Sequence, residues 1–176
     1  MNQAPLHRLR RFFCPDLTGP EVVLSDEEAH HALHVLRLSA GAEVSLFDGR
    51  GNSAVGRITR AGPRGVVAAV QRRPPAAQRP GAIVRLAFAV PKGKRLDWLL
   101  EKATELAAAS LCPVAFHRSI AGGEQLTPAK RRRWLTHCVA AAKQSGTDFL
   151  PDIEPLMPLT RFLKVTQRTG SLLIRN

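Results

Sequence analysis

Residues 82–90 read AIVRLAFAV and are followed at once by the loop PKGKR at residues 91–95. The apolar stretch is almost unbroken, which is typical of a strand buried on both faces of a parallel sheet. Apolar side chains then recur at helical spacing, at Leu96, Leu99, Leu100, Ala103 and Leu106. A strand, a short loop and an amphipathic helix in this order predict an α/β arrangement for the second half of the chain.

The same alternation continues towards the C-terminus. Residues 112–117 predict a second strand, and Thr127 followed by Pro128 is typical of a helix start, with the helix reaching about Ser145. The apolar stripe expected on that helix consists of Trp134, Leu135, Cys138, Ala141 and Ala142. Residues 171–174 predict the beginning of a third strand. We therefore expect a mostly parallel sheet covered by helices.

The first half of the chain is predicted to be mostly β. Residues 44–47, 53–59 and 65–70 predict strands, and the glycine-containing turn DGRGN at residues 48–52 joins the first two. One helix interrupts them, with Ser25 as N-cap and Glu28 three residues later, as a capping box requires. Strands around one short helix indicate a small barrel or sandwich of the kind that carries RNA-binding modules.

A proline-rich stretch separates the two halves. Residues 73–81, RPPAAQRPG, show no periodicity and are typical of a linker. We therefore expect one domain at residues 1–72 and a second at residues 82–176.

The chain is strongly basic, with 26 Lys and Arg against 14 Asp and Glu in 176 residues and a net charge of +12. Such an excess favours polyanions, above all nucleic acid, although the drift of a GC-rich genome towards arginine would produce a similar bias. Neither a signal peptide nor a membrane-spanning run is recognisable. Three widely spaced cysteines fit a reducing cytosol. These features predict a cytoplasmic protein that does not enter a membrane.

Two basic clusters lie in the second half. Lys92, Lys94 and Arg95 follow the first buried strand, where α/β proteins usually bind ligands, although the stretch is not a Walker loop. The second cluster, residues 130–133, fills the first helical turn, where the macrodipole disfavours cations unless an anion compensates them. Free backbone N–H groups at that helix end would strengthen an anion site. Each cluster predicts RNA contact, and the alternative is a solvated basic surface.

The N-terminal part adds further arginines. Arg8, Arg10 and Arg11 precede Phe12 and Phe13, a pattern that can hold phosphate and stack on bases. The two phenylalanines can equally anchor a first strand in the core. Two more basic residues, Arg37 and Arg50, are expected to extend the same surface.

The residues themselves predict neither a catalytic centre nor a metal site. His30 and His34 lie one helical turn apart, but no H-E-x-x-H motif and no third ligand accompany them. Cys138 falls on the apolar stripe of its helix and is expected to be a packing residue. No nucleophile–base pair and no dinucleotide-binding glycine motif is present.

Several motifs resemble one family in order and spacing. They are RRFF at residues 10–13, HVLRL at 34–38, LFDG at 46–49, KGKRLDW at 92–98, EKATEL at 101–106, RS at 118–119, RW at 133–134, AAKQSG at 141–146 and PDI at 151–153. Through them the chain resembles bacterial 16S ribosomal RNA uridine N3-methyltransferases, the RsmE family. The resemblance covers nearly the whole chain.

The resemblance implies a PUA-like RNA-binding β-barrel followed by a SPOUT methyltransferase domain, which is α/β, knotted and dimeric. It further implies S-adenosylmethionine as cofactor, and the small ribosomal subunit, with its 16S rRNA, as partner. Knots are rare among folds, and periodicity cannot reveal them. Together with the basic clusters, the resemblance predicts RNA contacts at Arg10, Arg11, Arg37, Arg50, Lys92, Lys94, Arg95, Arg118, Lys130, Arg131, Arg132 and Arg133.

Two departures from the family pattern stand out. The family's Gln-Ser-Gly-Arg reads Gln144-Ser145-Gly146-Thr147 here, so a basic contact is lost or supplied from elsewhere. The Gly-Pro-Glu-Gly-Gly loop, which helps to form the knot and the cofactor pocket, would follow residues 172–174 and lie beyond Asn176. We therefore expect a truncated SPOUT domain without identifiable catalytic or cofactor-binding residues. The alternatives to a methyltransferase are a non-catalytic RNA-binding protein and a remnant without function.

Overall fold

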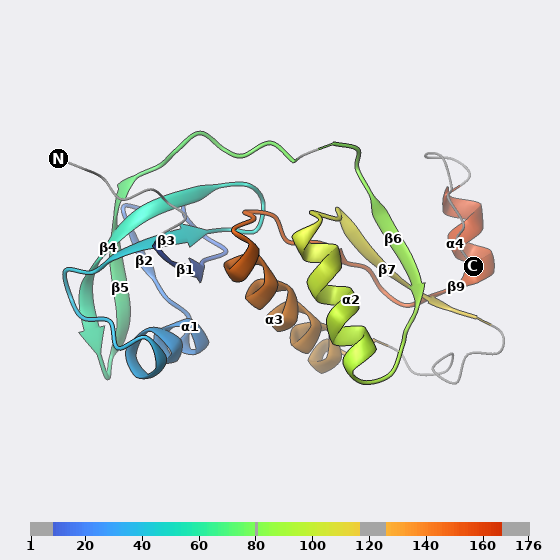
Figure 1. The fold of residues 1–176 in the computed structure, drawn as a ribbon, viewed down its shortest axis with the longest axis horizontal. Coiled ribbons are helices and arrows are strands. Elements are labelled where there is room, and N and C mark those ends of the chain that lie inside the picture. The colour runs from blue at the N-terminus through green and yellow to red at the C-terminus, as the bar shows by residue number, and fades with distance from the viewer. Residues whose placement is uncertain (1–8, 80, 117–125, 167–176) are drawn as a thin grey trace. The chain divides into compact units, whose positions relative to one another are not determined.

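The computed structural model describes residues 9–79, 81–116 and 126–166. The chain divides into two compact units, which are considered separately (Figure 1). Unit 1 comprises Met1–Gly81 and Val139–Leu150, and unit 2 comprises Ala82–Cys138 and Pro151–Asn176. No helix in the described part of the chain is long and apolar enough to cross a membrane.

Unit 1 is built on a five-stranded sheet in the order β1-β3-β4-β5-β2. Its strands are β1 (Arg10–Phe13), β2 (Glu21–Val23), β3 (Glu43–Phe47), β4 (Ser53–Gly62) and β5 (Gly65–Arg72). Strand β1 pairs in parallel with β3, and the remaining neighbours are antiparallel. The sequence predicted β3, β4 and β5 correctly, whereas β2 is too short to show a period.

The core of unit 1 lies against one face of this sheet. Phe12, Val44, Leu46 and Ile58 are almost completely buried in it. Of the two roles considered for Phe12, packing in the core is the one that the structure shows. Burial of large side chains from three different strands is the main force that holds such a small unit together.

The helix predicted at Ser25 is present, although its capping differs from the expectation. Helix α1 (Asp26–His30) begins where the Ser25 hydroxyl accepts a hydrogen bond from the Glu28 backbone, at 3.3 Å, and it continues as a π-helical turn, η2 (His31–Val35). The Glu28 carboxylate bonds Lys143 rather than returning to the backbone of Ser25. Directly after this turn, Arg37 takes a positive φ of 53°.

Unit 2 contains the predicted parallel sheet. Strand β7 (Ser110–Ala115) pairs in parallel with β6 (Arg85–Ala89), β8 (Asp152–Ile153) and β9 (Met157–Pro158). The helices are α2 (Lys94–Glu105), α3 (Pro128–Ser145) and α4 (Leu159–Thr166). Helix α3 has the predicted bounds. Strands β8 and β9 have two residues each, too few for a detectable pattern.

Side chains from the helices cover parts of this sheet. Phe88 of β6 stacks on Trp134 of α3 with ring centroids 6.0 Å apart. Phe162 of α4 packs against Cys112 and Val114 of β7. Cys138 is fully buried, as expected of a packing residue, and its burial raises the pKa of its thiol.

The second half of the chain differs from the expectations at strand β6 and at the end of helix α2. Strand β6 was predicted to be buried on both faces, and this is wrong, because Arg85, Ala87 and Ala89 on one of its faces are exposed. Ile83 and Val84, just before it, are 78% and 53% exposed. Leu106 is 81% exposed because it follows the last turn of α2 instead of lying on its apolar stripe. The strand predicted at residues 171–174 lies outside the described residues.

The proline-rich segment packs on unit 1. The Arg73 guanidinium donates to the carbonyl groups of Leu17 and Gly19, at 2.8 and 2.6 Å, and the Ala77 amide donates to Gly51 at 2.8 Å. Packing also assigns residues 139–150, the second half of α3 and the loop after it, to unit 1. Proline content therefore marks a change in the chain, whereas the compact units are defined by contacts between distant segments.

Candidate nucleic-acid interface

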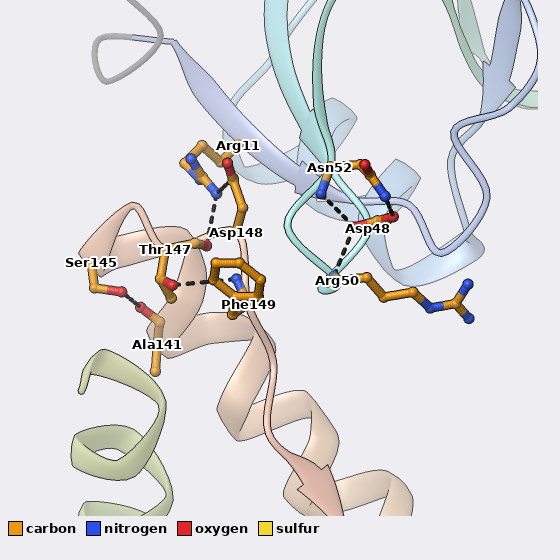
Figure 2. A network of polar contacts seen from close by, with 9 residues as sticks. All are labelled: Arg11, Asp48, Arg50, Asn52, Ala141, Ser145, Thr147, Asp148 and Phe149. Carbon is orange, nitrogen blue, oxygen red and sulfur yellow. Dashed lines mark hydrogen bonds and ion pairs between the residues drawn. The ribbon is translucent and has the colours of Figure 1, made fainter. Parts of the chain in front are cut away.

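Arg11 ties the loop after α3 to strand β1 within unit 1 (Figure 2). Its guanidinium donates to the Thr147 carbonyl at 2.9 Å and to the Asp148 carboxylate at 2.7 Å. It also lies 4.7 Å from the centre of the Phe47 ring, and its side chain is 10% exposed. A phosphate could reach this guanidinium only by displacing Asp148. The contact also places a cation beside Thr147, where the family pattern has an arginine.

The turn at residues 48–52 is held by the buried Asp48 carboxylate. One oxygen accepts from the backbone N–H groups of Arg50 and Asn52, at 2.7 and 3.1 Å, and the other accepts from the Asn52 side chain at 2.6 Å. Gly49 and Gly51 have φ values of 77° and 101°, which favour glycine. The Arg50 side chain extends away from the turn (Figure 2). A rigid turn therefore presents one exposed guanidinium.

A second ion pair lies deeper in unit 1. The Lys143 ammonium donates to both oxygens of Glu28, at 2.8 and 3.1 Å, and the side chains are 20% and 8% exposed. Burial, with the Glu28 charge nearby, raises the pKa of the Cys14 thiol to about 12. Burial and the Lys143 charge together lower the pKa of His31. Nothing in the sequence around Glu28 or Lys143 indicates this pairing, because 115 residues separate the two.

In unit 2, Asp97 of α2 brings the two predicted basic clusters together. Its carboxylate lies 3.7 Å from the Arg133 guanidinium and 3.4 Å from Nε2 of His137. Asp97 is one turn after Lys94, and Arg133 belongs to the cluster at residues 130–133. The start of α2 thus meets the second and third turns of α3, and the exposed side chains of Lys92, Lys94, Arg95 and Arg132 lie on these two segments.

The start of α3 differs from the expected anion site. The Lys130 N–H donates to the Thr127 hydroxyl oxygen at 3.3 Å, and the Arg131 N–H donates to the Thr127 carbonyl at 2.9 Å. Pro128 has no N–H to offer. The Arg131 contact is the first hydrogen bond within the helix, so of the free backbone donors expected at this end the Lys130 N–H is already occupied by the Thr127 side chain.

Comparison with known proteins identifies the relatives of this chain. The profile of the RNA methyltransferase PUA domain matches residues 24–71, and that of the RNA methyltransferase domain matches residues 79–175. The chain belongs to the RNA methyltransferase family. The two matches cover most of unit 1's sheet and the whole described part of unit 2.

Curated relatives of this chain are named as ribosomal RNA methyltransferases. Ribosomal RNA small subunit methyltransferase E of Bacillus subtilis is 27% identical over 151 residues, covering 85% of this chain and 58% of that protein. The Mycobacterium bovis protein of the same name is 32% identical over 146 residues, covering 81% and 54%. The chain thus spans little more than half the length of these relatives.

Solved structures of RNA methyltransferases share the fold. Ribosomal RNA small subunit methyltransferase E from Neisseria gonorrhoeae, solved bound to S-adenosyl methionine, has a TM-score of 0.79 at 25% identity, covering 89% of this chain and 65% of that one. A probable rRNA-methyltransferase from Porphyromonas gingivalis has a TM-score of 0.74 at 28% identity, covering 88% and 63%. The fold is therefore α/β, with a PUA-like N-terminal domain before a SPOUT methyltransferase domain.

The predicted RNA-contacting residues of this member of the RNA methyltransferase family divide between the units. Those of unit 1 are Arg10, Arg11, Arg37 and Arg50, and those described in unit 2 are Lys92, Lys94, Arg95, Lys130, Arg131, Arg132 and Arg133. Arg118 lies outside the described residues. Arg11, Arg131 and Arg133 are engaged by Asp148, Asp152 and Asp97 respectively.

Sequence reasoning missed Asp97 and His137 as members of the basic surface. One local signal was available, since His137 is four residues after Arg133 and therefore on the same side of α3. No local signal indicates that α2 and α3 face each other at this point. Their pairing depends on the sheet that both helices cover.

Proposed function

We propose that this protein methylates N3 of a uridine in 16S rRNA, with S-adenosylmethionine as the methyl donor. The observation that carries the proposal is the match of both family profiles in order along one chain. The names of its curated relatives support ribosomal RNA as substrate, and the cofactor bound to the Neisseria gonorrhoeae relative supports the donor. The cofactor would supply the methyl group, whereas the residues described here would bind and orient RNA.

The described residues do not themselves fit the cofactor. A hollow of about 450 Å³ at the start of α3 is large enough for a small molecule, but Arg131 and Arg132 line it. Its one carboxylate, Asp152, is already paired with Arg131. Two guanidinium groups would repel a sulfonium centre. The hollow is therefore not suited to the cofactor, and the family pattern puts the cofactor loop after residues 172–174.

RNA binding is the part of the proposed function that falls to the basic surfaces. Arg50 on its rigid turn and the exposed Arg10 and Arg37 supply cations in unit 1. The two basic clusters at the starts of α2 and α3, which meet at Asp97, supply them in unit 2. Arginine binds phosphate through two parallel hydrogen bonds, so such surfaces give affinity that weakens as salt is added.

A second candidate function is RNA binding without methyl transfer. The basic surfaces favour this alternative, because RNA binding through them requires no cofactor. Calorimetric titration with S-adenosylmethionine separates the two functions, together with methyl transfer from labelled cofactor to small ribosomal subunits. Heat of binding and labelled 16S rRNA are expected for the methyltransferase. Absence of both signals, while RNA still binds, would leave the second function as the correct one.

The charge surface provides an independent test of RNA binding. Replacing Lys130, Arg131, Arg132 and Arg133 together by alanine should weaken RNA binding and flatten the dependence of log K on log salt. The exposed Arg161 and Lys164 of α4 belong to the same unit, and their replacement serves as a control that also changes charge. An unchanged salt slope in the four-residue variant would show that this helix turn does not contact RNA.

We also propose that the protein works in the cytoplasm as a homodimer. Trp98 and Ile83 in unit 2 are 63% and 78% exposed, and apolar surface of this kind is stabilised when a second chain covers it. Sedimentation velocity over a range of protein concentrations tests the proposal. A single monomer peak at the highest concentration would refute the dimer.

A further inference from the structure

We infer that the hollow at the start of α3 receives one unpaired nucleotide of the RNA, with its base inside and its phosphate at the rim. This inference rests on the proposed function and specifies the form of RNA that unit 2 recognises. It distinguishes single strands from duplexes, which charge by itself cannot do.

The interior of the hollow is mainly apolar. Leu126, Leu135 and Pro151 contribute to its walls, and its volume of about 450 Å³ lies in the range of pockets that hold small molecules. A flat, largely apolar ring gains free energy by leaving water for such a surface. The size and the mainly apolar lining therefore suit a nucleobase, whereas a bare phosphate ion would use only the two arginines.

One wall of the hollow is a guanidinium group that is held in place. Arg131 lines the hollow, and its Nε donates to the Ile153 carbonyl at 3.0 Å while a terminal nitrogen lies 3.3 Å from the Asp152 carboxylate. Both contacts are to the same short strand, and together they favour one orientation of the group, although the Arg131 side chain is 58% exposed. Unpaired bases in RNA complexes commonly stack on arginine planes as well as on aromatic rings. A guanidinium already held in place loses little side-chain entropy when a base stacks on it.

The second arginine of the hollow, Arg132, provides the charge that would bind the phosphate. Arg132 also lines the hollow, is exposed, and forms no ion pair with a carboxylate in the described ranges. With Asp152 neutralised by Arg131, the charge of Arg132 remains for a phosphate. An apolar interior with a cation at the rim is complementary to a nucleotide, which is apolar at its base and anionic at its phosphate.

The geometry also explains why the RNA must be single-stranded at this point. Bases within an A-form duplex are stacked on both faces and paired at their edges, so none can enter a hollow in a protein surface. A duplex can still contact Arg132 and the neighbouring cations through its phosphates. Filling the hollow should therefore affect single strands alone, whereas removing charge should affect both forms.

Two variants of the full chain separate these effects. Leu135→Trp fills the hollow without changing charge, and Thr136→Trp places the same ring on the exposed neighbouring position of α3 as a matched control. The probes are a labelled oligouridine of about ten nucleotides and an RNA duplex of the same length. We expect Leu135→Trp to weaken oligouridine binding about tenfold relative to Thr136→Trp, with duplex binding and the salt slope unchanged. Arg132→Ala should lower the salt slope by about one for both probes.

Equal oligouridine affinity of the two tryptophan variants would overturn the inference while leaving RNA binding intact. Equal weakening of oligouridine and duplex by Leu135→Trp would also overturn it, because the hollow would then not select unpaired bases. If the unchanged protein bound neither RNA, the proposed function itself would fail. Circular dichroism of each variant establishes that α3 is still folded.

Discussion

Replacing Lys143 by methionine would leave the Glu28 carboxylate buried in unit 1 without its cation. Both oxygens of Glu28 bond the Lys143 ammonium, and the carboxylate side chain is 8% exposed. Methionine keeps most of the apolar stem of lysine, so the loss is mainly electrostatic. Removing one partner of a buried pair destabilises a protein by about 3 to 5 kcal/mol. We expect about 3 kcal/mol, since the Lys143 side chain is 20% exposed and water can partly replace it.

The two units can be followed separately during unfolding. Both tryptophans, Trp98 and Trp134, lie in unit 2, so fluorescence reports on that unit. Cys14 is buried beside Glu28, so pulsed alkylation at increasing urea concentration, read by mass spectrometry, reports on unit 1. Lys143→Met should move the alkylation midpoint to lower urea, by the ratio of about 3 kcal/mol to the m-value of the transition.

A matched control comes from an exposed ion pair of the same unit. Arg57 and Glu43 are 2.9 Å apart with side chains 47% and 37% exposed. Arg57→Met should cost under about 1 kcal/mol, because water screens such pairs. The double variant Glu28→Gln/Lys143→Met should recover part of the lost stability, since no buried charge remains. If Lys143→Met shifted the midpoint no further than Arg57→Met, the Glu28 pair would not stabilise unit 1 as argued.

Three other changes have defined outcomes. Gly51→Ala would place a Cβ 2.7 Å from the Phe149 ring, at a residue whose φ is 101°. The free energy of unfolding measured in urea should therefore fall by about 2 kcal/mol or more. An unchanged free energy of unfolding would mean that the turn rearranges freely. Burial raises the pKa of the Cys14 thiol from 9.0 to about 12, so this thiol ionises at lower pH in the unfolded chain than in the folded protein. The free energy of unfolding should therefore be constant below pH 9 and should fall by up to about 1.4 kcal/mol per pH unit as the pH rises from 9 to 12. Cys14→Ala should flatten that slope, and an unchanged slope would refute the assignment. Arg37→Gly removes the side chain from a residue with a positive φ of 53°, so the free energy of unfolding should rise by about 1 kcal/mol. The same variant should bind RNA more weakly, because it loses a guanidinium. A more stable variant with unchanged RNA binding would exclude Arg37 from the interface.

Local features of the fold could be predicted because they depend on neighbours in the chain. Ser25 caps α1, Thr127 and Pro128 start α3 at the expected residue, and the glycines of the 48–52 turn take positive φ. The alternation of strand and helix after residue 82 predicted the parallel sheet for the same reason. The very short strands β2, β8 and β9 were missed, since two or three residues contain no measurable period.

The sequence by itself determined the secondary structure of the longer segments, the basic character and the family of this protein. Only the tertiary structure decided which cations remain exposed. Arg11 and Arg50 look alike in the sequence, yet Arg11 is bound by Asp148, 137 residues away, while Arg50 extends from its turn. The exposure of β6 and the meeting of two basic clusters at Asp97 were decided in the same way. Periodicity records which face of an element is apolar, whereas ion pairing depends on which distant element packing brings beside it.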